Sequence, residues 1–162
     1  METVNLWRPD QLDMISVARF PSHKQVTSHM PLGMRLPMYC TASGRAYLSA
    51  CSAEVLESVL AQTNYVAYSS ETDIDPGSIR SRVIVARERG FATAISEYYR
   101  GDISIAAPIT SHEGNAVAAV NISVPVTRWN PQVAVEHFSQ FVLETARVLS
   151  GTAAASAGDL KR

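Results

Sequence analysis

Three small polar side chains, Ser104, Asn121 and Ser123, alternate with aliphatic residues in two predicted strands at 102–110 and 115–125. Because successive side chains of a strand point to opposite faces, these three fall on a face of small residues, and isoleucine and valine fill the other face. Hydroxyl and amide groups among small neighbours could floor a small cavity. They could equally lie on a solvated face, which is common in antiparallel sheets, and the strand pattern alone favours that second interpretation.

The segment CTASGRA at residues 40–46 favours the cavity. Thr41 can cap a helix there, and the small residues Ser43 and Gly44 leave the first backbone N–H groups of that helix approachable, a natural seat for a carboxylate. Together with the strand hydroxyl and amide groups, this helix start would suit a small organic acid. The glycine alone has a simpler explanation, which is close packing of the helix start against a neighbouring segment.

The residues that most often catalyse reactions or bind metals form no motif. His23, His29, His112 and His137 do not stand at metal-ligand spacing from one another or from a cysteine, so we predict no metal site. The two cysteines are expected to be free thiols, and no serine lies in a GxSxG motif. An enzyme acting on a small acid would need a general base, and only Glu97 and His29 are candidates, neither convincingly placed. We therefore predict no catalytic residue and no cofactor.

The elements that must position the polar residues can be read from hydrophobic alternation and from capping signals. Strands are predicted at 2–9, 12–20, 91–99, 102–110 and 115–125. Helices are predicted to begin after Thr41, Ser52 and Asp75 and at Pro131. Residues 23–35 are expected to form a loop with one weak extended stretch. This order of strands and helices predicts an α+β domain around a central antiparallel sheet, flanked by helices.

Length, composition and charge exclude several classes of protein. The chain has 162 residues, enough for one domain, with 14 Lys and Arg against 15 Asp and Glu, a formal charge of −1. That balance lacks the basic excess on which nucleic-acid binding normally depends. No apolar run approaches the roughly 20 residues needed to cross a bilayer. Since the N-terminus does not resemble a signal peptide, we expect a cytoplasmic location and no membrane partner.

Three motifs give the chain a family resemblance. They are LPMYCTASGRAYLSA, RERGFATAISEYYRGDISIAAPI and EGNAVAAVNISVPVTRW. In this order they resemble the effector-binding domain of IclR-type bacterial transcription regulators, over about Glu2 to Gly151. The resemblance implies a GAF-like or profilin-like fold at 1–151, followed by a flexible tail at 152–162. It also implies a homodimer or tetramer with a small organic acid as effector. Family members carry an N-terminal winged helix-turn-helix that is absent from this sequence, so DNA binding is expected to belong to a parent protein.

Matched position by position, the family's ligand pocket falls on six residues of this chain. They are Ala42, Ser43, Ala94, Ser104, Asn121 and Ser123. Members that bind glyoxylate or pyruvate tend to have Asp in place of Ala94 and Cys in place of Ser104. The missing Asp predicts a roomier and less polar pocket, so an aromatic carboxylate is favoured over a two-carbon acid. Possible wall residues are Met34, Met38, Tyr98 and Trp129.

The resemblance and the residues leave three functions to compare. The first is a sensor domain whose acid ligand favours one arrangement of the oligomer and so alters operator binding. The second is a ligand-free dimerisation module, and the third is an enzyme acting on a small carboxylate. The family motifs favour the sensor domain.

Overall fold

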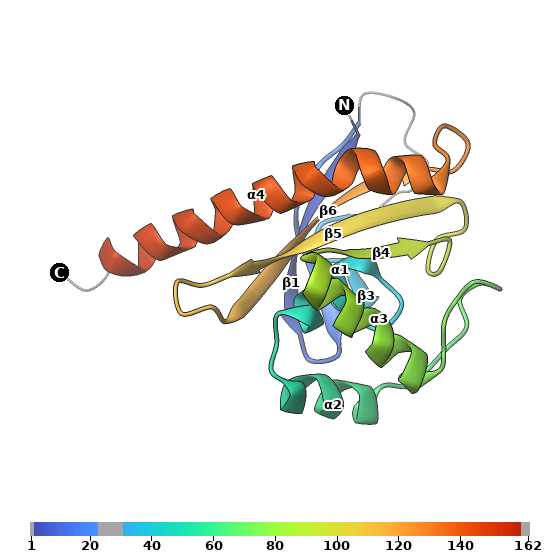
Figure 1. Ribbon diagram of the computed structural model, residues 1–162, viewed down its shortest axis with the longest axis horizontal. Coiled ribbons are helices and arrows are strands. Elements are labelled where there is room, and N and C mark those ends of the chain that lie inside the picture. Colours follow the sequence, from blue (N-terminus) through green and yellow to red (C-terminus); the bar gives the residue numbers. More distant parts are fainter. Residues whose placement is uncertain (1, 23–30, 160–162) are drawn as a thin grey trace.

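A six-stranded antiparallel sheet forms the centre of the molecule (Figure 1). The computed structural model describes residues 2–22 and 31–159, from 152 onward as backbone only. The strands are β1 (Thr3–Asp10), β2 (Asp13–Phe20), β3 (Arg35–Pro37), β4 (Ala92–Ile95), β5 (Asp102–Thr110) and β6 (Ala116–Pro125). They stand in the order β3-β2-β1-β6-β5-β4. With four helices beside this sheet in the chain, the domain is α+β, as predicted.

The central pairing of β1 with β6 joins segments more than a hundred residues apart in sequence. Asn5 lies opposite Asn121, and Trp7 lies opposite Ala119. Residues paired across two strands point their side chains to the same face. The N-terminal hairpin therefore extends the polar face that the two C-terminal strands begin.

Each face of the sheet packs against its own set of helices. The isoleucines and valines of β5 and β6 form one core with α4 (Pro131–Asp159). The small-residue face forms a second core with α1 (Ala42–Ser49), α2 (Ala53–Gln62) and α3 (Pro76–Arg89), and α1 and α3 lie on the opposite side of the sheet from α4 (Figure 1). The solvated interpretation of the small-residue face is therefore wrong: α1 packs on β4, β5 and β6 and covers it.

The helix starts follow the predicted capping residues. Thr41 Oγ1 accepts a hydrogen bond from Gly44 N, and Ser52 and Asp75 cap α2 and α3 in the same way. Gly90 ends α3 in the left-handed conformation, at φ 82°. Two elements differ in length from the predictions. The strand at 91–99 is only Ala92–Ile95, and α4 continues through Asp159, where the sequence pattern predicts no helix.

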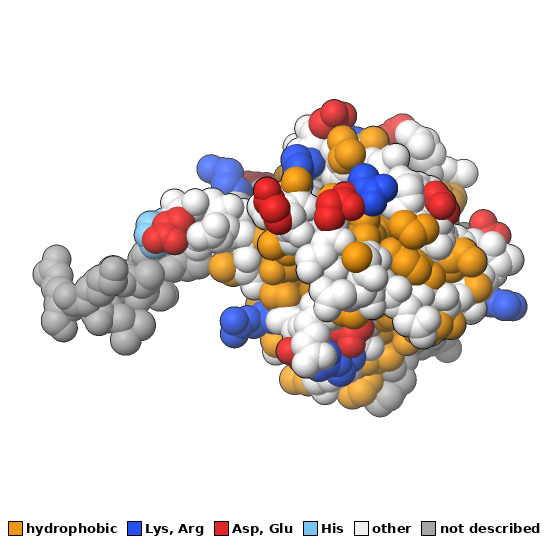
Figure 2. Space-filling view, turned by 90° about the horizontal axis from the view of Figure 1, so that it is seen from below, with side chains coloured by type: hydrophobic (Ala, Val, Ile, Leu, Met, Phe, Trp, Pro, Cys, Tyr) orange, Lys and Arg blue, Asp and Glu red, His pale blue; other side chains and the backbone are white. Residues whose placement is uncertain are grey.

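The region expected to be a loop before α1 contains the short strand β3, and residues 23–30, with His23 and His29, lie outside the described residues. Among the described residues, no helix combines the length and apolarity that crossing a bilayer requires. The surface over α2 and α3 carries acidic and basic side chains mixed with apolar ones (Figure 2). The arginines of α3 are part of this mixture. Arg80 pairs with Glu57 of α2, and Arg87 donates to the backbone oxygens of Ser49 and Cys51. They tie helices together and form no basic patch.

Candidate functional site

A cavity lies between the start of α1, the floor of the sheet and the turn that joins β4 to β5. Its empty space is about 380 Å³, open mouth included, and little of it is wide enough to hold a water molecule, so the cavity is narrow. The six residues predicted as the ligand pocket all line it: Ala42, Ser43, Ala94, Ser104, Asn121 and Ser123. The structure therefore brings together residues from four separate elements.

Asn121 organises the floor of this cavity. Its Oδ1 accepts hydrogen bonds from Trp7 Nε1 at 2.7 Å and from Asn5 Nδ2 at 3.1 Å. An indole N–H can only donate, so it requires the amide oxygen, not the amide nitrogen, to face β1. The amide nitrogen then faces the strand hydroxyls, and Nδ2 donates to Ser104 Oγ at 2.8 Å and to Ser123 Oγ at 3.1 Å.

This orientation decides what the two serines offer to the cavity. Because each serine oxygen already accepts a proton from Asn121, each hydroxyl proton is left to donate. The proton of Ser104 has no acceptor among the described residues, and Ser123 Oγ lies 3.5 Å from Asp102 Oδ2, at the limit of hydrogen bonding. The floor is therefore a donor surface held in place by a buried amide.

The start of α1 forms the opposite wall. Arg45 N makes the first intrahelical bond, to Thr41 O at 3.1 Å, so the helix supplies no acceptor for the N–H groups of Ala42 and Ser43. The Ser43 side chain is 3% exposed, and its hydroxyl has no hydrogen-bond partner in the part of the chain that the structure describes. The wall thus adds hydrogen-bond donors and the positive end of a helix dipole.

Gly44 is explained by packing, as the simpler interpretation has it. A Cβ at this position would lie 2.2 Å from the Met38 Cα and 2.3 Å from the Met38 oxygen. These are backbone atoms that cannot move aside. Glycine therefore lets the helix start approach the segment that leads into it, and this approach sets the position of Ala42 and Ser43.

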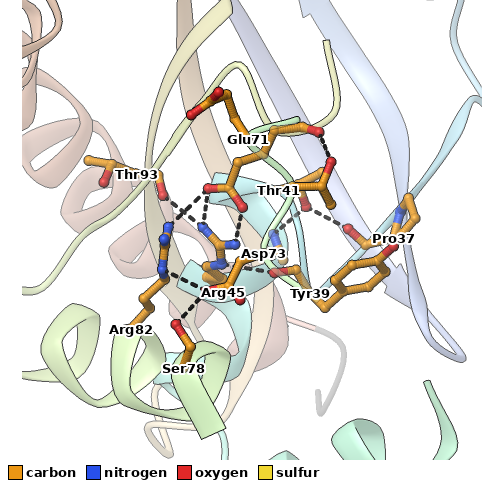
Figure 3. Close-up of polar contacts among 12 residues, drawn as sticks. Pro37, Tyr39, Thr41, Arg45, Glu71, Asp73, Ser78, Arg82 and Thr93 are labelled. Atoms are coloured by element: carbon orange, nitrogen blue, oxygen red, sulfur yellow. Dashed lines mark hydrogen bonds and ion pairs between the residues drawn. The ribbon is translucent and has the colours of Figure 1, made fainter. Parts of the chain in front are cut away.

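A buried ion pair holds α1 against the end of β4. Arg45 is 1% exposed and Glu97 is 3% exposed, and the two form a bidentate pair in which Arg45 Nη1 lies 2.6 Å from Glu97 Oε1. Arg45 also donates to the backbone oxygens of Tyr39 and Thr93 (Figure 3). Beside it, Arg82 of α3 forms an ion pair with Asp73. With Arg82 Nη1 at 3.2 Å as well, both Glu97 oxygens are held by guanidinium groups. Glu97 lines the cavity, but both of its oxygens are engaged by arginines of two helices, which leaves it ill suited to act as a general base.

Asp102, the first residue of β5, was missed by the sequence analysis and lines the cavity. Burial raises the pKa of its carboxyl to about 7, and the Ser123 hydroxyl only partly offsets this effect. The expectation that Ala94 makes the pocket less polar is therefore wrong, since a carboxyl group enters from the neighbouring strand. Alternation could have found it, because Asp102 stands two residues before Ser104 on the same face.

The remaining predicted wall residues are only partly in place. Tyr98 lines the cavity together with Tyr99, whereas Trp129 packs with α4 on the opposite face of the sheet. Met38 belongs to the core, and Met34 Sδ accepts a hydrogen bond from Tyr99 Oη at 3.3 Å, behind the cavity wall. The walls therefore include two tyrosines and Trp7, and only one of the four predicted residues.

The cavity shows no nucleophile or metal centre in the part of the chain that the structure describes. Burial raises the pKa of Cys40 to about 12, so its thiol stays protonated. No group of three His, Cys, Asp or Glu side chains among the described residues could hold a metal ion. His112 is exposed beside Glu113, and His137 stacks on Trp129 at 5.4 Å between ring centroids, on the far side of the sheet. What the cavity offers is hydrogen bonding.

The antiparallel sheet is covered by helices and has a donor-lined cavity on its polar face. This arrangement is typical of a small-molecule binding domain, and comparison with known proteins identifies its family. Residues 1–151 match the family model described as bacterial transcriptional regulator IclR C-terminal. The chain belongs to this family, whose members are transcriptional regulators and not enzymes.

Relatives and solved structures agree with this assignment. The chain is 30% identical to the HTH-type transcriptional repressor AllR of Klebsiella pneumoniae over 92% of its length, and 30% identical to the Pca regulon regulatory protein of Pseudomonas putida over 91%. The crystal structure of the Thermotoga maritima IclR superposes with a TM-score of 0.88 at 25% identity, covering 94% of this chain and 61% of that one. The two curated relatives are covered to 54% and 51%, so the chain spans about half of their length.

Proposed function

We propose that this domain is the effector sensor of a DNA-binding transcriptional regulator and that its cavity binds a small organic acid. The observation that carries the proposal is the set of donors that converge on one cavity. Asn121 leaves the hydroxyl proton of Ser104 free to donate, and Ser123 beside it makes only a long bond to Asp102. Both serines line the cavity with a helix start whose N–H groups lack helical acceptors. A carboxylate accepts several hydrogen bonds at once and is favoured by the helix dipole.

The walls favour an aromatic acid. Trp7, Tyr98 and Tyr99 line the cavity, and flat rings pack well against aromatic side chains. A crystal structure of a double mutant of the PobR inducer-binding domain from Acinetobacter, in complex with 3-hydroxybenzoic acid, shares this fold with a TM-score of 0.81 at 24% identity. The narrowness of the cavity implies that Tyr98 or Tyr99 shifts when an acid of that size enters.

The regulatory step follows from thermodynamic linkage. An acid that binds one arrangement of a homodimer or tetramer more tightly than another shifts the population toward the first, and affinity without that difference shifts nothing. DNA-binding domains elsewhere in the parent protein would then change their spacing on the operator. We propose the cytoplasm as the location, since operator DNA and small acids meet there.

Thermal unfolding against a panel of small carboxylates tests this function. A ligand at 100 times its dissociation constant should add about 2.7 kcal/mol, a shift of several degrees for a domain of this size. Ser104→Leu and Ser123→Leu should abolish the shift while the domain stays folded, because leucine fills the cavity and removes a donor.

The matched control is Ser58→Leu, an exposed serine of α2 that does not line this cavity. It should leave the acid-induced shift intact. Wild-type affinity in both cavity variants would contradict the site. If no acid in the panel shifts the unfolding temperature, the result would instead favour the second function, a dimerisation module that binds no acid.

A further inference from the structure

The carboxyl group of Asp102 gives the cavity a hydrogen-bond acceptor in addition to the donors of the helix start; we call these two groups the two poles of the cavity. Asp102 lies opposite Pro125, and Ser104, the next residue of β5 on the same face, lies opposite Ser123. Along a strand, the Cα atoms of Asp102 and Ser104 are about 7 Å apart. The carboxyl therefore lies at the Ser123 end of the cavity floor, with Oδ2 3.5 Å from Ser123 Oγ. The backbone there is fixed, since Asp102 N donates to Tyr99 O at 3.2 Å and Asp102 O accepts from Ser96 N at 2.8 Å.

Asp102 differs from the other carboxylate of the cavity in that no cationic side chain of the described residues pairs with it. Glu97 is held by Arg45 and Arg82, whereas no ion pair joins Asp102 to any residue in the described ranges. Its nearest polar contact is the long one to the Ser123 hydroxyl, at 3.5 Å. Tyr99 lines the cavity beside it and supplies no charge.

An unpaired carboxylate in a narrow cavity is costly unless the occupant satisfies it. Removing such a group from water without a compensating hydrogen bond costs free energy, and a binding site with this feature rejects occupants that leave it unpaired. The occupant must therefore complement two poles, a donor-lined helix start and an acceptor carboxylate. An acid with an apolar far end satisfies only the first.

We propose that Asp102 is a specificity-determining residue that selects acids bearing a second group, a hydroxyl or an amine, able to donate a hydrogen bond to its carboxylate. The inference rests on the proposed function, since it assumes that an acid occupies the cavity. It goes further by requiring the effector to be bifunctional and to lie with its donor group at the start of β5. The missing Asp at Ala94 is then replaced by a carboxyl from a different strand, at a different position along the cavity.

Matched acids test the inference. The probes are benzoate, 3-hydroxybenzoate, 3-aminobenzoate and 3-methoxybenzoate, with butyrate and 3-hydroxybutyrate as an aliphatic pair. Affinities are measured by calorimetry at pH 8 on wild type, Asp102→Asn and Asp102→Leu. Wild type should prefer the hydroxyl-bearing acid of a pair by about tenfold or more, since hydrogen bonds to charged groups are the strong ones.

The variants separate the role of charge from that of shape. Asp102→Leu should lose the preference for a donor group and bind the methoxy and hydroxy acids within about threefold, in line with the loss of one hydrogen bond. Asp102→Asn keeps an acceptor oxygen and should retain a reduced preference for the hydroxyl. Glu88→Gln, which removes an exposed carboxylate on α3, is the control and should leave all affinities unchanged.

The outcomes distinguish this inference from the function on which it rests. Acids that bind without a donor preference, or a preference that survives in Asp102→Leu, would overturn the role of Asp102 and leave the acid sensor standing. If no probe binds wild type, the proposed function fails and the role of Asp102 fails with it. A preference that Asp102→Leu abolishes, Asp102→Asn reduces and Glu88→Gln leaves intact supports both.

Discussion

Trp7 Nε1 donates to Asn121 Oδ1 across the β1–β6 pairing, at 2.7 Å, and both side chains are buried. This bond lies at the middle of the sheet, yet it determines which hydrogen-bonding groups face the cavity. It fixes which end of the Asn121 amide faces Ser104 and Ser123, and so makes the serine hydroxyls donors toward a ligand. A residue of the N-terminal strand thereby controls the hydrogen-bonding character of a site built mainly from the C-terminal half.

The first prediction concerns Trp7→Phe. Phenylalanine keeps most of the ring volume but removes the donor, so one hydrogen bond to the Asn121 oxygen is lost and its amide orientation is less strictly determined. We expect a loss of about 1–2 kcal/mol in the free energy of unfolding, measured by urea denaturation. Acid affinity should fall by roughly three- to tenfold, as expected for a weakened hydrogen-bond network.

Trp129→Phe is the matched control, because Trp129 packs with α4 on the other face of the sheet. It should leave acid affinity unchanged. Equal effects of the two substitutions on binding would argue against a role for the Trp7 bond in orienting the amide.

The second prediction concerns the buried pair of Arg45 and Glu97. Glu97→Gln removes the charge that compensates a guanidinium only 1% exposed, so we expect a loss of about 3–5 kcal/mol. In the double variant Arg45→Met, Glu97→Met no unpaired charge remains. Its loss should be smaller than the sum of the losses of the single variants Arg45→Met and Glu97→Met, which complete a cycle with wild type. Urea denaturation of all four proteins measures this coupling.

The exposed pair of Arg80 and Glu57 provides the control for that cycle. Its hydrogen bonds are also bidentate, but solvent screens the charges, so Glu57→Gln should cost far less stability than Glu97→Gln. A cost for Glu97→Gln as small as that would show that the buried pair does not anchor α1.

The third prediction is a pH dependence that arises from Asp102. Its pKa rises from 3.8 to about 7 on folding, so between these values the folded state binds more protons than the unfolded state. The stability that this group contributes is therefore fully present below pH 4 and is lost as the pH rises through 7. Each pKa unit corresponds to about 1.4 kcal/mol.

The difference between wild type and Asp102→Asn isolates this effect. The variant cannot ionise at this position, so its stability relative to wild type should rise from pH 4 to pH 8. The side chains of Cys40, Tyr98 and Tyr99 do not interfere in this range, because burial raises their pKa values above the usual ones. Parallel stability curves for the two proteins across this range would contradict a buried, unpaired carboxyl.

Local chemistry explains which parts of the fold were predictable. Capping residues such as Thr41 and Asp75 act within three residues of themselves, so the helix starts can be read directly from the sequence. Alternation likewise separates the faces of β5 and β6. What covers each face is not local information, and for that reason the strand pattern taken alone favours a solvated polar face, whereas the structure has that face covered by α1.

The residues of the candidate site also fall into those that the sequence predicts and those that only the structure reveals. Motifs and alternation predicted Ser104, Asn121 and Ser123, but the group that orients them, Trp7, comes from a pairing across more than a hundred residues that no local pattern reveals. Arg45 was missed for the same reason, because an arginine in a short helix is ordinarily exposed. Only the tertiary structure supplies the Glu97 that allows its burial.

The last prediction concerns Gly44, where close approach and not conformation requires glycine. Gly44→Ala would place a Cβ 2.2 Å from the Met38 Cα, and because both partners are backbone, α1 would have to move away from the segment before it. We expect a loss of about 3 kcal/mol or more, at the upper end of the cost of overpacking, and weakened acid binding in any protein that still folds, because Ala42 and Ser43 move with the helix. Gly77→Ala is the control: it lies in the first turn of α3, and its nearest contact would be the Asp75 side chain at 3.2 Å, which needs to shift by only a few tenths of an ångström and can keep its cap on Ser78 N. Its cost should stay below about 1 kcal/mol, since alanine is favoured over glycine in a helix. Urea denaturation compares the two, and a Gly44→Ala protein as stable as the Gly77→Ala protein would show that α1 does not need this approach to hold its place over the cavity.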